Sequence, residues 1–173
     1  LAMIDSDADK SKFEILYSEY KNLMYYTANR ILRNSSDAED VVHQAFLKVI
    51  EILDTISSPR CHKTRALLVT ITEHKAIDLY REKQRRNVLP LAEEYIGAAP
   101  AAEIERLAER DTLTAAIASL PPRYRSVLLL RYDCGYSNAE IANILDTTEP
   151  NVRKLIQRAK EKLSAALSEM EEP

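Results

Sequence analysis

SNAEIANILDTTEPNVRKLIQRAKEKL, residues 137–163, is the stretch that decides how the C-terminal part of this chain folds. Ser137 and Glu140 precede an apolar run at the spacing of a capping box, which marks a helix start. Residues 146–148 then interrupt the apolar periodicity. Thr148 is a suitable N-cap for a second helix, because Pro150 would lie in its first turn, where a missing N–H costs little. The stretch therefore predicts two short helices joined by a tight turn.

The second of these helices is predicted to have an apolar face and a basic face. The apolar positions at helical spacing are Val152, Leu155, Ile156, Ala159 and Leu163. The other face carries Arg153, Lys154, Gln157, Arg158, Lys160 and Lys162. Such a pair is the sequence form of a helix-turn-helix, whose second helix enters the major groove of DNA. Asn and Arg near its start can read bases, and Lys and Arg further along can bind phosphates. An ordinary helical hairpin with a solvated basic face is the alternative interpretation.

Composition predicts an all-α protein of two small domains. The chain has 173 residues, of which 46% are hydrophobic, and only two glycines. Helical periodicity predicts helices at about 11–33, 37–54, 64–86, 103–119 and 123–134, with a loop at 55–63. Two helical domains are expected at residues 8–88 and 103–169. The acidic segment 89–102, with Pro and Gly, is expected to be a flexible linker.

Charge and cysteine usage narrow the function classes. The net charge of −3 argues against a histone-like protein that is basic over its whole surface. Residues 151–162, however, hold five basic residues and one acidic residue. Cys61 and Cys134 are isolated, so we expect neither a disulfide framework nor a metal site, and no cofactor motif is present. No apolar run is long enough for a membrane span, and the polar N-terminal residues do not resemble a signal peptide. We therefore expect a cytoplasmic protein without direct membrane insertion.

Three segments, in this order, resemble one family. They are DAEDVVHQAFLKVI at 37–50, AIDLYREKQRR at 76–86, and LPPRYRSVLLLRYDCGYSNAEIANIL followed by NVRKLIQRAKEKL within 120–163. Together they are similar to the extracytoplasmic-function (ECF) sigma factors of the sigma-70 family, the promoter-recognition subunits of bacterial RNA polymerase. The resemblance implies that residues 8–88 form a region 2-like domain that binds core polymerase and the minus-10 element. It implies that residues 103–169 form a region 4-like helix-turn-helix domain that binds the minus-35 element.

The resemblance also assigns residues to each contact. The beta-prime clamp of RNA polymerase core would bind Asp37, Glu39, Asp40, Gln44, Phe46 and Leu47. Minus-10 promoter DNA would contact Arg60, His62, Lys63, His74, Lys75, Asp78, Arg81, Arg85 and Arg86. Minus-35 DNA would contact Ser137, Asn151, Arg153, Lys154, Gln157 and Arg158. The chain departs from the family at Leu67 and His74, where a Trp and an Asn are usual, and this puts the promoter preference in question.

Other functions are weighed against this one. The runner-up is a stand-alone helix-turn-helix transcriptional regulator, which would not need the 37–50 helix. An enzyme is not expected, since the chain has no HExxH, CxxC, Gly-rich phosphate loop or nucleophile elbow. Glu149 could accept a hydrogen bond from a cytosine, but the preferred interpretation is that it favours a helix N-terminus. The resemblance further implies an anti-sigma factor as a partner.

Overall fold

The computed structural model describes residue 4, residues 6–87 and residues 111–171. Within these ranges the secondary structure is helical and contains no strand, so the all-α prediction is confirmed. The chain divides into two compact units, Leu1–Pro90 and Leu91–Pro173. The predicted linker at 89–102 and the expected helical residues 103–110 lie outside the described residues.

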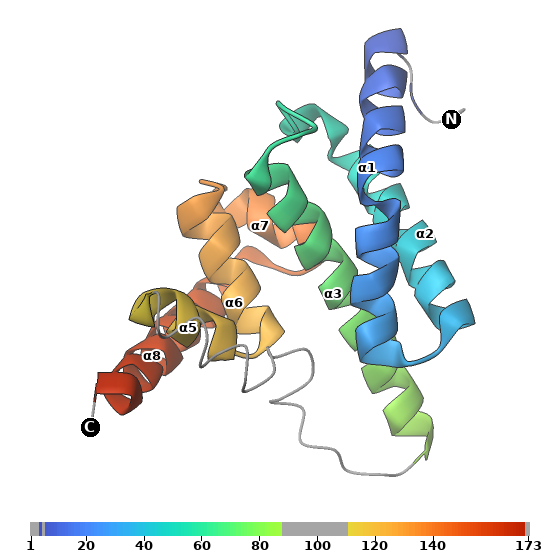
Figure 1. Ribbon diagram of the computed structural model, residues 1–173. Coiled ribbons are helices and arrows are strands. Elements are labelled where there is room, and N and C mark those ends of the chain that lie inside the picture. The colour runs from blue at the N-terminus through green and yellow to red at the C-terminus, as the bar shows by residue number, and fades with distance from the viewer. Residues whose placement is uncertain (1–3, 5, 88–110, 172–173) are drawn as a thin grey trace. The chain divides into compact units, whose positions relative to one another are not determined.

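The first unit is a bundle of three helices. These are α1 (Asp7–Leu32), α2 (Ser35–Glu51) and α3 (His62–Asn87), with a short 3-10 helix η1 (Leu53–Thr55) after α2. Each of the three long helices packs against the other two, as the blue, cyan and green ribbons of Figure 1 show. Leu16, Met24, Leu68 and Ile71 are almost completely buried at their interfaces. Burial of each such side chain contributes about 1.5–3 kcal/mol, so these contacts stabilise the bundle.

A two-residue turn joins α1 to α2. Arg33 adopts the left-handed conformation, with a φ of 51°, and its N–H donates to the carbonyl of Asn29, which closes α1. Asn34 is the N-cap of α2, and its side chain accepts from the backbone N–H of Asp37. The sequence predicted that this helix begins near Asp37, but the Asn34 cap sets its start two residues earlier, at Ser35. It also ends at Glu51, three residues before the prediction, because the chain tightens into η1.

The second unit is built around one long helix, α8 (Glu149–Glu171). This helix packs against α5 (Thr112–Ser119), α6 (Pro122–Leu128) and α7 (Asn138–Ile144). Val127, Leu130, Ile141 and Val152 fill the core between them. Between α6 and α7 the chain forms a π-helix, η3 (Leu129–Asp133), which the sequence did not predict.

Two residues with positive φ shape the turns on either side of α7. Gly135, with a φ of 79°, lies in the turn that leads into α7, where a residue without Cβ adopts this conformation at no steric cost. Asp146, with a φ of 50°, lies in the turn between α7 and α8. After it the N–H of Thr147 donates to the carbonyl of Ala142, so α7 stops and the chain changes direction. These turns fix where the start of α8 lies relative to α7.

Candidate functional site

The exposed face of α2 gathers most of the polar residues that the 37–50 segment predicted for a partner. Glu39, Asp40 and Gln44 are exposed, and Leu47 keeps 43% of its surface accessible. Phe46 is buried, so it supports this face from below and does not lie on it. Its ring packs edge-on against Phe13, with ring centroids 5.7 Å apart. The face therefore offers carboxylates, an amide and one apolar side chain to a partner.

Asp37 differs from the other predicted residues of this face. Its carboxylate forms an ion pair with Lys83, which lies near the end of α3. The pair spans 46 positions of sequence and joins the start of α2 to the basic end of α3. Asp37 thus links the helix predicted to bind polymerase, α2, to the helix predicted to bind minus-10 DNA, α3.

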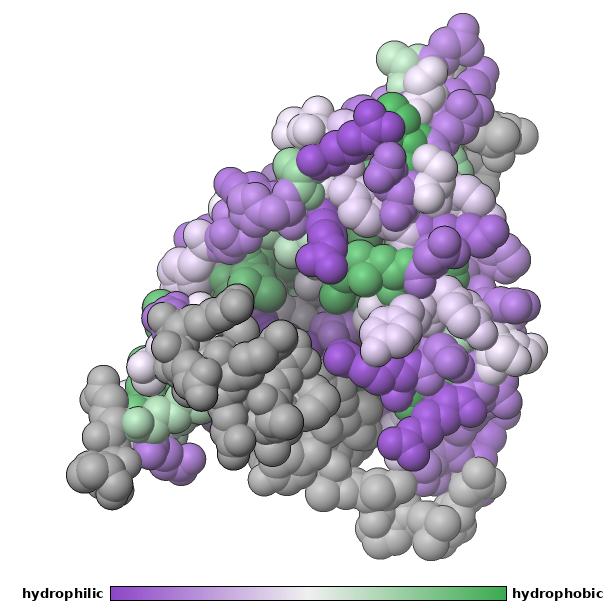
Figure 2. All heavy atoms as spheres, viewed as in Figure 1, coloured by the Kyte–Doolittle hydropathy of each residue, from purple (hydrophilic) through white to green (hydrophobic). Residues whose placement is uncertain are grey.

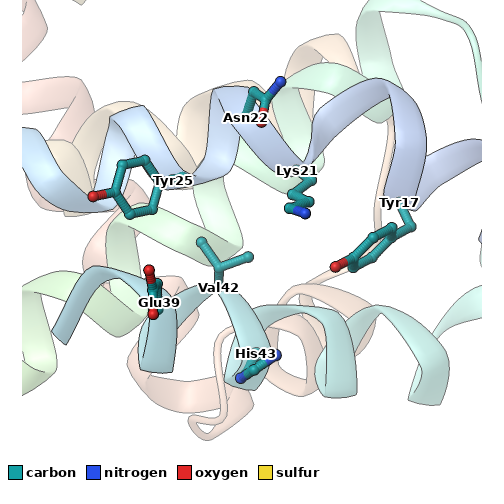
Figure 3. Close-up of a pocket in the computed structure, with 7 residues that line it drawn as sticks. All are labelled: Tyr17, Lys21, Asn22, Tyr25, Glu39, Val42 and His43. Atoms are coloured by element: carbon teal, nitrogen blue, oxygen red, sulfur yellow. The ribbon is translucent and has the colours of Figure 1, made fainter. Parts of the chain in front are cut away.

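A groove of about 330 Å³ runs along α2 where it faces α1. Figure 3 shows side chains from the two helices on its opposite sides, with Tyr25 of α1 across from Glu39 of α2. The lining residues are Tyr17, Lys21, Asn22, Tyr25, Glu39, Val42 and His43. In the view of Figure 2, hydrophilic residues cover most of the visible surface of α1 and α2. The groove is thus a partly aromatic hollow in a polar surface.

Sequence reasoning missed the α1 side of this groove. Tyr17, Lys21 and Tyr25 are four residues apart, a spacing that places them along one face of a helix. Tyr17 remains 38% exposed, and the ammonium of Lys21 lies 5.2 Å from the centroid of its ring. The i, i+4, i+8 spacing indicates a shared helix face, but the sequence alone did not show that α2 lies opposite it.

The loop before α3 carries the predicted minus-10 residue Arg60, whereas His62 and Lys63 form the start of α3, which begins two residues before the predicted 64. This segment is held at several points. The hydroxyl of Tyr20 on α1 donates to the carbonyl of Pro59 at 2.9 Å. The Thr64 hydroxyl donates to the carbonyl of Ser58 at 2.6 Å. Arg60 forms an ion pair with Glu19 of α1 at 3.1 Å. The backbone of this basic loop is therefore fixed by α1 and by the start of α3.

Two groups in this region have shifted pKa values. Burial raises the pKa of the Tyr20 phenol, with smaller contributions in the same direction from the nearby Cys61 and Glu19. The hydrogen bond with the Thr64 side chain lowers the pKa of the Cys61 thiol, and the Thr64 backbone N–H adds to this. Tyr20 is therefore maintained as a neutral hydrogen-bond donor to the loop.

The remaining predicted minus-10 residues lie further along α3. His74, Asp78, Arg81 and Arg85 follow i, i+4, i+7, i+11 spacing and share one stripe of the helix. The residues on a neighbouring stripe are Lys75 and Arg86, and Arg86 pairs with Glu82 at 2.6 Å. Lys63 and Lys75 are roughly 18 Å apart along the helix axis at 1.5 Å per residue. The structure therefore separates the predicted residues into one cluster at the start of α3 and a second cluster toward its end.

In the second unit, α7, the turn and α8 have the local structure that the sequence predicted. The Ser137 side chain accepts from the Glu140 N–H, and the Glu140 carboxylate accepts from the Ser137 N–H at 2.7 Å, which completes the capping box. The backbone bond lowers the pKa of Glu140, and the Ser137 hydroxyl adds to the effect. Thr148 accepts from the Asn151 N–H at the start of α8, as expected of an N-cap.

The predicted minus-35 residues of α8 lie together on its exposed side. Val152, Ile156 and Ala159 face the core. The exposed residues opposite them are Asn151, Arg153, Lys154, Gln157 and Arg158. The Asn151 side-chain amide donates to Thr147 at 3.3 Å, and Arg153 pairs with Glu149 at 2.5 Å. Glu149 lies in the first turn of α8, where an acid favours the helix N-terminus, and its carboxylate also pairs with Arg153.

Basic side chains of this unit also stack on tyrosines. Lys160 of α8 lies 5.2 Å from the ring centroid of Tyr132, which is 60% exposed. Arg123 and Lys162 both lie over the ring of the buried Tyr124. Through Lys160 and Lys162, these contacts connect the middle of α8 to η3 and α6. Nothing in the local sequence pattern indicated them.

No cluster of three or more His, Cys, Asp or Glu side chains in the described ranges is arranged to hold a metal ion. Among residues 4, 6–87 and 111–171, no helix has both the length and the apolar character that a membrane span needs.

Comparison with known proteins follows the division into two units. Residues 16–86 match the family model of sigma-70 region 2, and residues 110–163 match that of sigma-70 region 4. The ECF RNA polymerase sigma factor SigW of Bacillus subtilis is 26% identical over 94% of this chain and 92% of its own length. SigL of Mycobacterium tuberculosis, also an ECF sigma factor, is 26% identical over 94% and 93% respectively.

A solved structure was also matched. It is the complex of the sigma factor RpoE with the anti-sigma factor NepR from Bartonella quintana. It is 17% identical, covers 94% of this chain and 97% of that one, and has a TM-score of 0.43. The relatives SigW and SigL are sigma factors, a class of protein that is not enzymatic. The two matching regions, present on one chain in this order, do not favour a stand-alone regulator.

Proposed function

This chain belongs to the ECF group of the sigma-70 family and directs transcription as a sigma factor, and from that premise we propose which of its surfaces bind polymerase and promoter. Core RNA polymerase binds the exposed face of α2 through its beta-prime clamp. Promoter DNA binds the loop before α3, the first turn of α3 and its basic end, and also the helix-turn-helix of α7 and α8. The protein acts in the cytoplasm, because bacterial RNA polymerase, its proposed partner, transcribes DNA in that compartment.

The polymerase contact rests on what α2 exposes. Glu39, Asp40 and Gln44 give hydrogen-bond acceptors, and Leu47 gives an apolar contact beside them. Such a surface suits a partner that supplies basic and amide side chains around a small apolar centre. The buried Phe46 and its contacts with Phe13 and Tyr17 hold the helix in place under this face.

The minus-10 contact rests on the loop and on α3. Arg60, His62 and Lys63 project from a backbone that Tyr20 and Thr64 hold in one conformation. Opening a promoter requires that separated bases are held, and basic loops beside planar side chains suit this. The helix cluster from Lys75 to Arg86 provides cations for the phosphates. His74 stands at the position that the family usually fills with Asn, and it is our candidate for a base contact.

The minus-35 contact rests on the exposed face of α8. In a helix-turn-helix the start of the second helix meets base edges, which here places Asn151 and Arg153 in the major groove. Lys154 and Arg158 lie on the flank of the same face, where phosphates approach. Ser137, the N-cap of α7, is exposed and its N-terminal position suits a phosphate contact.

We also propose an anti-sigma factor as a partner that competes with polymerase. The exposed Tyr17 and Leu47 give the α1–α2 surface apolar area that a covering protein would bury. If such an inhibitor exists, it should co-purify with the chain from its native host. A chain that is fully active in those cells and isolated alone would contradict this part of the proposal.

The observation that carries the proposal is the presence of a region 2 unit and a region 4 helix-turn-helix on one chain, with both predicted faces exposed. Run-off transcription with bacterial core polymerase on a pool of promoter fragments tests it. We expect discrete new transcripts only when the protein is added. Absence of core binding and of transcripts would refute the assignment of both surfaces.

Matched variants separate the two surfaces. The double variant Asp40→Ala with Gln44→Ala should weaken core binding by about tenfold or more, since it removes two interface partners. Asp7→Ala, at the fully exposed start of α1, removes an acid elsewhere and serves as the control. Arg153→Ala with Arg158→Ala should leave core binding unchanged and abolish selection of the upstream element.

A further inference from the structure

The first turns of α8 contain an ion pair between two exposed residues. Nη2 of Arg153 donates to Oε1 of Glu149 at 2.5 Å, across one helical turn. The side chains remain 63% and 42% exposed respectively. Asn151, between them in sequence, donates its side-chain amide to Thr147. The two predicted base-reading side chains, Asn151 and Arg153, therefore each donate to an acceptor at or just before the start of α8.

Stability alone gives little reason for this pair. Exposed pairs of this spacing contribute very little to folding, because both charges remain solvated. On approach to DNA a carboxylate at this position repels the phosphates and lowers affinity. Glu149 is thus unfavourable for plain attraction to DNA. Apart from its favourable place at the helix N-terminus, the effect of Glu149 is therefore on Arg153, its ion-pair partner.

An arginine reads guanine only when its planar fork is correctly oriented. Two of its N–H groups must point together at O6 and N7 of the base. A free arginine side chain samples many rotamers and loses that freedom on binding. The contact with Glu149 uses one guanidinium nitrogen, and arginine has five N–H donors in a fixed plane, so donors remain for a base. Exclusion of water in the groove strengthens the pair further.

We propose that Glu149 is a positioning residue for minus-35 recognition, which orients Arg153 to read a guanine in the upstream element. The proposal rests on the proposed binding of α8 to minus-35 DNA. It assigns the discrimination of one base pair to the pair Glu149–Arg153. It also gives the two residues opposite effects on general affinity, since Arg153 attracts the phosphates and Glu149 repels them.

The test uses the full chain assembled with bacterial core polymerase. Templates with a randomised upstream element are transcribed, and sequencing of the transcribed and starting pools gives the preference at each base pair. For the wild type we expect one base pair with a strong guanine preference, of the order of tenfold to a hundredfold for a good bidentate contact. Arg153→Lys keeps the charge, loses the fork and should abolish that preference.

Glu149→Ala should reduce the guanine preference at the same base pair by about threefold or more, which is typical of coupled neighbours. It should also raise binding to unrelated duplex DNA, since one negative charge is lost. Glu149→Gln retains an acceptor oxygen and should restore part of the preference. Adding Glu149→Ala to Arg153→Lys should change nothing further at that base pair. Glu169→Ala, an exposed acid near the end of α8, is the control.

The outcomes are distinct. If the wild type selects upstream elements but Glu149→Ala leaves the guanine preference intact, or alters a different base pair, the positioning role is overturned while minus-35 binding stands. If the wild type selects no upstream sequence at all, both the binding and the positioning role are overturned. Circular dichroism of each variant detects loss of α8, and the Gln variant keeps the test valid if the Ala variant is less helical.

Discussion

Replacing Tyr20 by phenylalanine should loosen the basic loop that is proposed to bind the minus-10 element. The change removes one hydroxyl, which donates to the Pro59 carbonyl at 2.9 Å, and leaves the buried ring in place. A hydrogen bond of this kind contributes about 1 kcal/mol net. Because Pro59 is half-buried, water can partly replace the lost donor. We therefore expect a destabilisation of about 1 kcal/mol, which is about fivefold in the equilibrium for opening the loop.

The pH dependence of this effect has a definite sign. The pKa of Tyr20 is raised in the folded protein above its ordinary value of 10.0, because burial disfavours the phenolate. The stabilisation is therefore fully present below about pH 10 and is lost as the pH rises through the folded pKa. The difference in unfolding free energy between wild type and Tyr20→Phe should be constant near neutral pH and should shrink above about pH 10.

Two measurements check this prediction. Native-state hydrogen exchange, followed by mass spectrometry, should show faster exchange of amides at residues 56–66 in Tyr20→Phe at neutral pH. Urea unfolding followed by far-UV circular dichroism gives the free-energy difference across the alkaline range. Tyr26→Phe is the matched control, since Tyr26 lies on the same helix but is 68% exposed. The proposed role of the Tyr20–Pro59 hydrogen bond would be refuted if amide exchange were equal in Tyr20→Phe and Tyr26→Phe and their unfolding free energies changed in parallel at alkaline pH.

Three further predictions concern the core, the capping box and the basic face. Leu68→Ala, at a site with no exposed surface, should destabilise the first unit by about 2–5 kcal/mol in urea unfolding, whereas Leu113→Ala, 47% exposed in the second unit, should cost under about 0.5 kcal/mol. Ser137→Ala should lower the unfolding free energy of the second unit by about 1 kcal/mol. Because the pKa of Glu140 is lowered, its stabilisation should be lost as the pH falls below its ordinary 4.5, and Glu140→Gln should remove that slope in acid titrations. Lys154→Ala should reduce the slope of log affinity against log salt for promoter DNA by about one and leave base preferences unchanged; a changed preference would contradict a phosphate contact.

Local signals in the sequence predicted most of the helices. The capping box at Ser137 and Glu140 and the Thr148 cap depend on residues three apart, so their geometry is readable from the chain itself. The start of α2 was predicted two residues too late, because Asn34 serves as its cap. The π-helix η3 carries no recognisable sequence pattern, since its extra residue per turn is accommodated by packing.

Contacts between distant residues could not be predicted in this way. The Asp37–Lys83 and Glu19–Arg60 pairs span 46 and 41 positions, and their formation depends on how three helices pack. The α1 side of the groove was missed for the same reason, because Tyr17 and Tyr25 line a hollow only when α2 lies opposite them. The residue types at the candidate site were therefore predictable, whereas their partners required the fold.

The turn between α1 and α2 has a consequence for how this chain tolerates changes of length. Arg33 is the C-cap of α1 and Asn34 is the N-cap of α2, so both residues of the connection are helix caps. An insertion there would separate the two caps, and each added residue would allow α2 to rotate or slide against α1. Glu39 would then no longer lie opposite Tyr25. The shape of the groove is thus set by a connection of two residues, and we expect lengthening of this turn to disturb partner binding even where every residue of the groove is unchanged.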